Sequence, residues 1–180
     1  MMPVNDQKID NKPTKKMFCI LIVGIIPLLL TFLIYMSNKN SNILNYINSI
    51  SGKIPELLSA SNPLLSGVMS FYVKTAPLYG VVFFINSYKI LNLNKSLPLI
   101  KLIIIFLLFT FFYIIILYFL LAYDVELTES GRLLRFLSGG DYLLTIFFIG
   151  VFYVCYTFTC YYLSYTYVIF MMLKEKLSFR

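Results

Sequence analysis

The sequence predicts an all-α integral membrane protein with four transmembrane helices in a compact bundle. Hydrophobic residues make up 59% of the 180 positions and charged residues only 13%, against about 25% charged residues in soluble domains. Polar segments divide the chain into four apolar stretches, each long enough to cross a hydrocarbon core of about 30 Å, which needs about 20 helical residues. We therefore expect residues 1–180 to form one membrane domain that lies in a lipid bilayer.

The first apolar stretch covers residues 17–36 and follows a polar tail, residues 1–16, that we expect to be flexible. The next segment, residues 37–62, is rich in Asn and Ser. Its apolar residues nevertheless recur at spacings of three and four, on one face of a helix: Ile43, Ile47, Ile50, Ile54 and Leu57. Two interpretations stay open, an amphipathic helix on the membrane surface or a loop that covers the end of the bundle.

The second apolar stretch carries Lys74 in its interior. A lysine at the bilayer centre costs about 2.5–3.5 kcal/mol, whereas each Leu, Ile, Val or Phe contributes about 0.3–0.6 kcal/mol to insertion, so this stretch still inserts. The span covers either residues 64–88, with Lys74 near the midplane, or residues 71–91, with Lys74 reaching towards the headgroups. In both placements Pro77 kinks the helix one turn from the charge.

The third span is expected at residues 102–123 and the fourth at residues 142–173. The connection between them is charged, and on a helical turn Arg132 and Arg135 would share a face with Glu129. The fourth span carries a stripe of small and polar residues, which either packs inward against other helices or binds a partner: Gly150, Tyr153, Thr157, Cys160, Ser164 and Tyr167.

The distribution of basic residues predicts the orientation. Lys and Arg number four in the tail, three in the connection from Lys89 to Lys101 and three at the C-terminal end, but only two in each of the other connections. Because basic residues gather on the cytoplasmic side, we expect both termini to be cytoplasmic. The connection that holds Glu126 and Glu129 then faces outward and is acidic, which would attract a basic partner.

Several function classes are disfavoured. The chain has no histidine, no Cys or carboxylate cluster with metal-site spacing and no glycine-rich phosphate loop, so we expect no enzyme, no metal and no cofactor. The lysines lie beside apolar spans, which argues against nucleic acid. Two functions compatible with these residues are a small transporter or channel subunit, with Lys74 as an intramembrane ionic site, and an accessory subunit of a larger membrane complex.

Several motifs together narrow the range of possible functions. They are Asn62-Pro63-Leu64, Val68-Met69 and Lys74-Thr75-Ala76-Pro77 in the second span, Glu126-Leu127-Thr128 with Gly131-Arg132 and Arg135 after the third, Gly24 with Pro27-Leu28-Leu29 in the first, and Ile149-Gly150 in the last. In this order and spacing the chain resembles immunity proteins against pore-forming colicins of the A, B and N type.

The resemblance implies a protein of the bacterial inner membrane that protects a colicin-producing cell. Members of that family bind the C-terminal pore-forming domain of their cognate colicin in the bilayer and prevent channel opening, without a cofactor or a small-molecule substrate. On this basis we expect the toxin contacts among seven residues, any of which could instead maintain the family fold: Lys74, Thr75, Pro77, Glu126, Glu129, Arg132 and Arg135.

Overall fold

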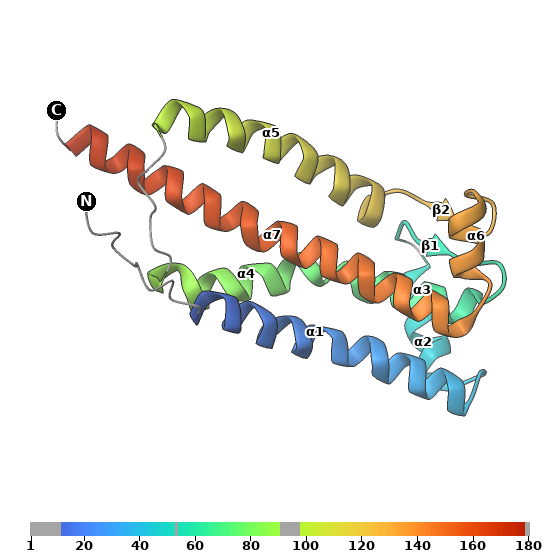
Figure 1. Cartoon of the computed structure of the whole chain (residues 1–180). Helices are drawn as coiled ribbons and strands as arrows, with labels where there is room; N and C mark the ends of the chain where they lie inside the picture. The colour runs from blue at the N-terminus through green and yellow to red at the C-terminus, as the bar shows by residue number, and fades with distance from the viewer. Residues whose placement is uncertain (1–11, 53, 91–97, 179–180) are drawn as a thin grey trace, which may run out of the picture.

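The computed structural model describes residues 12–52, 54–90 and 98–178 and is mainly helical. Within these ranges, four helical segments are long and apolar enough to cross a membrane, in agreement with the four predicted spans. They run side by side along one direction (Figure 1). Their bounds are Lys12–Ser37, Pro63–Ile90, Ile100–Ala122 and Asp141–Lys176.

The first span is a single helix, α1 (Lys12–Ser37), which contains Pro27. It begins upstream of Met17, so residues 12–16 are helical where the sequence predicted a flexible tail. The rest of that tail, residues 1–11, lies outside the described residues.

The second span is broken in its middle. It consists of α3 (Pro63–Val73), α4 (Ala76–Ser87) and a final 3-10 turn (Tyr88–Ile90), with Lys74 and Thr75 between the two α-helices. Asn62 precedes the first helical residue, Pro63, which is one residue before the start of the predicted placement at residues 64–88. The proline occupies the first helical position, which suits a residue without a backbone N–H.

The last helix, α7 (Asp141–Ser178), organises the packing, because it contacts α1, α3, α4, α5 (Leu99–Leu117) and α6 (Arg132–Ser138). At about 1.5 Å per residue it extends beyond a 30 Å hydrocarbon core. Half of its most apolar stretch is buried in the protein. The third span consists of α5 and a short π-helix (Tyr118–Ala122), and only 6% of its most apolar stretch is buried. The third span is therefore the most peripheral of the four.

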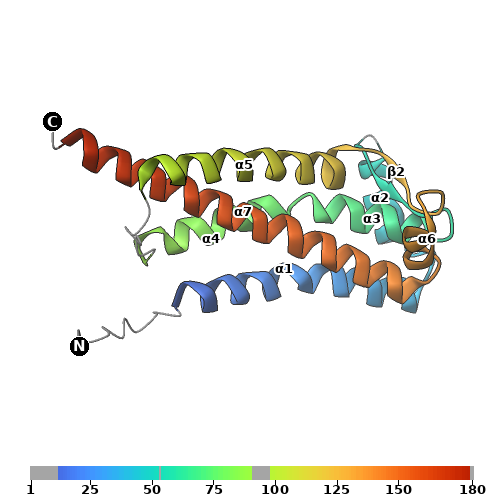
Figure 2. The same ribbon diagram turned by 45° about the horizontal axis from the view of Figure 1, so that its top comes forward.

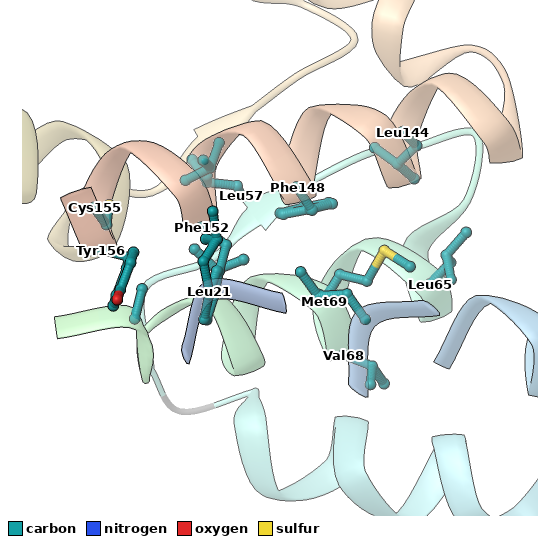
Figure 3. Packing of buried hydrophobic residues seen from close by; sticks show 14 of the residues in the cluster. Leu21, Leu57, Leu65, Val68, Met69, Leu144, Phe148, Phe152, Cys155 and Tyr156 are labelled. Atoms are coloured by element: carbon teal, nitrogen blue, oxygen red, sulfur yellow. The ribbon is translucent and has the colours of Figure 1, made fainter. Parts of the chain in front are cut away.

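The core lies where α1, α3 and α7 meet, and Figure 3 shows Met69 and Leu65 of α3 near Phe148 and Leu144 of α7. Glycine lets the helices approach closely. A Cβ added at Gly80 of α4 would lie 2.7 Å from Thr159 Cβ of α7, and one added at Gly24 of α1 would lie 2.6 Å from the Phe152 ring. The peripheral α5 packs on α7 through stacked rings, among them Tyr113 on Tyr162 with centroids 4.6 Å apart.

Shorter elements gather at the end of the molecule where α1 ends and α7 begins (Figures 1 and 2). They are α2 (Asn42–Ser51), β1 (Leu57–Leu58), β2 (Val125–Glu126) and α6, and we call them, with their connecting residues, the cap. The two strands pair in parallel, a small departure from the all-α prediction.

Candidate functional site: the cap

The cap joins two segments that lie far apart in the sequence. Leu57 pairs with Val125 and Leu58 with Glu126. The backbone N–H of Val125 donates to Glu56 O at 3.1 Å, and that of Leu127 donates to Leu58 O at 2.7 Å. These bonds satisfy backbone groups of two irregular segments, which would otherwise be left without partners beside the membrane.

Two acidic side chains reinforce this connection. Asp124 Oδ1 accepts a 2.7 Å hydrogen bond from the backbone N–H of Glu56, and Glu126 Oε1 accepts one of 2.9 Å from the N–H of Ala60. Glu126 Oε1 also accepts from the Thr128 hydroxyl. These bonds favour the ionised carboxylate and hold the pKa of Glu126 below its ordinary value, the Thr128 bond being the largest cause.

Lys74 reaches the cap from the break between α3 and α4. Its Nζ donates to Pro55 O, and the negative charges of Glu56 and Asp124 lie close enough to attract it. Glu56 is 92% buried, and its Oε1 has no hydrogen-bond partner among the described residues. Lys74 is therefore the cation that faces two acidic residues of the cap, and it does not stand alone inside an apolar span.

Thr75 and Pro77 shape the break that positions Lys74. The Thr75 hydroxyl donates to Tyr72 O at 2.7 Å, and the Thr75 backbone N–H donates to the same oxygen at 2.9 Å, so the last turn of α3 closes tightly. Pro77 lies in the first turn of α4, where a missing N–H has no cost. Both residues act locally on the backbone of the second span.

Glu129, Arg132 and Arg135 lie on the exposed side of the cap. Gly131, with φ of 94°, is the N-cap residue just before α6, so Glu129 precedes the helix and does not lie on its surface with the two arginines. The expected common helical face is therefore absent. Arg135 Nε donates to Thr128 O at 2.9 Å, which fixes α6 against the segment that carries Glu126.

Large apolar side chains are exposed next to these charges. Leu133 is 72% exposed and Phe136 is 67% exposed, one helical turn apart on α6 beside the two arginines. The sequence analysis treated this connection as charged and passed over both residues. The signal that could have revealed them is an i, i+3 apolar pair inside a polar loop.

The α2 helix also presents apolar residues outward. It buries Leu44 in the hydrophobic core, whereas Ile43 is 61% exposed, Tyr46 69% and Ile50 51%. Residues 42–51 are therefore helical, as the first interpretation expected, and they lie at the end of the bundle, as the second expected. Part of the isoleucine face is directed away from the protein.

The small and polar residues that form the stripe on α7 do not share one environment. Gly150 has no atom within 4 Å of an added Cβ, and Tyr153 is 43% exposed, whereas Cys160 is buried. The stripe repeats every three to four residues and changes its direction along the helix, so only part of it packs inward. Within the described ranges, no three acidic or cysteine side chains come together in a group that could hold a metal ion.

The protein-family comparison decides the assignment: a model described as "Colicin immunity protein" matches residues 40–177, which include the whole cap. The chain belongs to the colicin immunity protein family. This confirms the resemblance seen in the sequence and makes the protein an immunity protein, a class that acts on toxins and not as an enzyme.

Curated relatives of this immunity protein agree with the assignment. It is 30% identical to the colicin-A immunity protein of Citrobacter freundii over 96% of this chain and 99% of the relative. It is 28% identical to the colicin-B immunity protein of Escherichia coli over 83% of this chain and 86% of that relative. The colicin-N immunity protein of Escherichia coli is 41% identical over 44% of this chain and 60% of its own length. No solved structure matches the chain.

Proposed function

We propose that this immunity protein binds the C-terminal pore-forming domain of a cognate colicin in the bacterial inner membrane and prevents the channel from opening. The observation that carries the proposal is the cap, where exposed charged and apolar side chains are held on a hydrogen-bonded scaffold at one end of the transmembrane helices. The relatives are named for immunity to colicins A, B and N, which supports a toxin of that type.

The proposal includes an orientation. Both termini are cytoplasmic, the four helices form a compact bundle, and the cap faces the periplasm, from which an inserting toxin arrives. The basic residues beside the spans support this orientation through the positive-inside rule. Lys16 lies near the start of α1, Lys89 in the turn after α4 and Lys101 near the start of α5. These helix ends lie opposite the cap (Figure 1).

The seven candidate residues divide into two roles within this proposal. Glu129, Arg132 and Arg135 are exposed on the cap and contact the toxin together with Leu133 and Phe136, and Arg135 also fixes α6 through its hydrogen bond to Thr128 O. The other four hold the contact surface in place, because their side chains are engaged within the protein or shape its backbone: Lys74, Thr75, Pro77 and Glu126.

Recognition inside the bilayer depends on packing and polar pairing, since lipid tails are as apolar as leucine and give helices little hydrophobic reason to associate. The immunity protein would capture the closed state of the toxin. To move a channel from 99% open to 99% closed, it must bind the closed state about 10⁴-fold more tightly than the open state.

The transporter hypothesis relied on Lys74 as an isolated ionic site in the membrane. Its contact with Pro55 O and its position facing Glu56 and Asp124 are better explained by a structural role in the cap. Nothing else in the described residues favours transport over immunity.

The function is tested by expressing the full chain in a colicin-sensitive strain and challenging a lawn with pore-forming and nuclease colicins. We expect survival against one or two related pore formers and continued killing by a nuclease colicin that shares their receptor and uptake route. Protection against the nuclease colicin as well would mean that uptake has failed, and it would refute recognition at the pore.

The division of roles is tested in the same assay with membrane abundance measured by immunoblot. Arg132→Ala should lose protection at normal abundance, because the side chain is exposed. Lys101→Ala, an exposed basic residue on α5 at the opposite end, is the matched control and should protect fully. Loss of abundance in Arg132→Ala would assign that residue a structural role.

A further inference from the structure

A cavity of about 160 Å³ lies between three helices at the end of the molecule opposite the cap. Pro13 and Met17 of α1, Phe83 of α4, and Cys160 and Ser164 of α7 contribute to its wall. Gly80, one turn before Phe83, lets α4 and α7 approach closely. The cavity is therefore bounded by a close contact between α4 and α7 on one side and by the first turns of α1 on the other.

The lining of this cavity is mainly apolar, and its polar members are Thr14, Tyr161 and Ser164. The Ser164 hydroxyl donates to Cys160 O at 2.8 Å within α7, so its proton is already used. The Tyr156 hydroxyl donates to Met17 O at 2.9 Å and joins α1 to α7 beside the cavity. An open apolar space at membrane depth does not hold ordered water, which needs two to four polar partners. It is suited to a hydrocarbon chain.

The rim of the cavity is basic. Lys16 lies on α1 between the lining residues Thr14 and Met17. Its Nζ donates to Asn86 O of α4 at 2.9 Å, which leaves two ammonium hydrogens for another acceptor. Lys89 is exposed in the turn after α4. Neither α1, α4 nor that turn contains an acidic residue.

We propose that this cavity is a binding site for an anionic phospholipid, with one acyl chain between α1, α4 and α7 and the phosphate beside Lys16. Charge selects this ligand over a zwitterionic lipid, because a basic pocket between transmembrane helices favours anionic headgroups. The lipid fastens the first turns of α1 to α4 and α7. This site lies at the opposite end from the proposed toxin contacts and does not depend on them.

Native mass spectrometry of the purified full-length protein in detergent tests the site. The probes are dioleoyl phosphatidylglycerol and dioleoyl phosphatidylcholine, which share their acyl chains and differ in charge. We expect preferential retention of phosphatidylglycerol and about a fivefold loss of its affinity in Lys16→Gln, as one surface lysine contributes. Lys101→Gln, an exposed lysine on α5, is the control and should bind as the wild type does.

A second pair of variants tests the cavity itself. Ser164→Phe fills the space between the helices and should abolish retention of the lipid. Thr166→Phe is the matched control, because Thr166 makes the same hydrogen bond within α7, to Tyr162 O at 2.8 Å, but is exposed. Equal retention of both lipids, or retention that neither Lys16→Gln nor Ser164→Phe reduces, would overturn the proposal. If Ser164→Phe does not fold, Lys16→Gln and the comparison of lipids still decide.

Discussion

Replacing Lys74 with Met should open the cap while the transmembrane helices remain in place. The change keeps a long apolar side chain and removes the ammonium that donates to Pro55 O and faces Glu56 and Asp124. Pro55 is two residues before β1, so the segment that holds this strand against β2 loses its attachment to the second span.

The size of the effect follows from the contact. A hydrogen bond from a charged donor contributes about 1.5–3 kcal/mol, and the half-buried position of Lys74 places it at the lower end, about 1.5 kcal/mol. This corresponds to roughly a tenfold rise in the fraction of molecules with an open cap. Glu56, 92% buried, also loses the attraction of a nearby positive charge, which adds to the effect.

Hydrogen exchange of the purified full-length protein provides the assay. The amides of Val125 and Leu127 donate across the strand pair and should exchange about tenfold faster in Lys74→Met. Lys39→Met is the matched control at the same end: this lysine is 68% exposed, 3.8 Å from Asp141, and should contribute less than about 1 kcal/mol. Unchanged exchange in Lys74→Met, or equal acceleration in both variants, would refute the role of Lys74 in holding the cap closed.

Three other predictions concern packing, pH and toxin contact. Gly80→Ala should destabilise the protein by about 1–3 kcal/mol in thermal unfolding, because the new Cβ meets Thr159. Gly150→Ala has open space and should raise the melting temperature slightly, because alanine favours a helix over glycine. Because the pKa of Glu126 is lowered in the folded protein, its carboxylate stabilises the cap above about pH 4.5. This contribution is lost as the pH falls through the folded pKa. Glu126→Gln should therefore weaken the acid dependence of exchange at the Ala60 amide, which donates to Glu126. Phe136→Ser should reduce protection in the colicin challenge at unchanged membrane abundance; full protection would remove this 67% exposed ring from the proposed contact surface.

The spans could be predicted from the sequence because their signal is local. A run of about 20 apolar residues has few alternatives in a chain of this composition, and only its ends depend on the surroundings. Lys12 shows the limit: basic residues marked the expected tail, yet α1 starts there, since a lysine at a helix end can reach the headgroups while its backbone stays helical.

The cap could not be predicted, because its contacts are distant in the sequence. The pairing of Leu57 with Val125 occupies two residues in each strand, too few for any alternation to appear. The partner of Lys74 was missed for the same reason: Pro55 lies 19 positions earlier, in a segment assigned to another connection. The resemblance identified residues of the cap by their order and spacing. It did not distinguish residues that hold the cap together from residues whose side chains are exposed on its surface.

The strand pair has a consequence for biosynthesis. β1 emerges from the ribosome before the second and third spans, and β2 emerges after them. If only one of the two intervening spans crosses the bilayer, the two strands lie on opposite sides of the membrane and cannot pair. A chain that inserts the second span but fails to insert α5 therefore leaves β1 with unpaired backbone groups and an exposed strand edge.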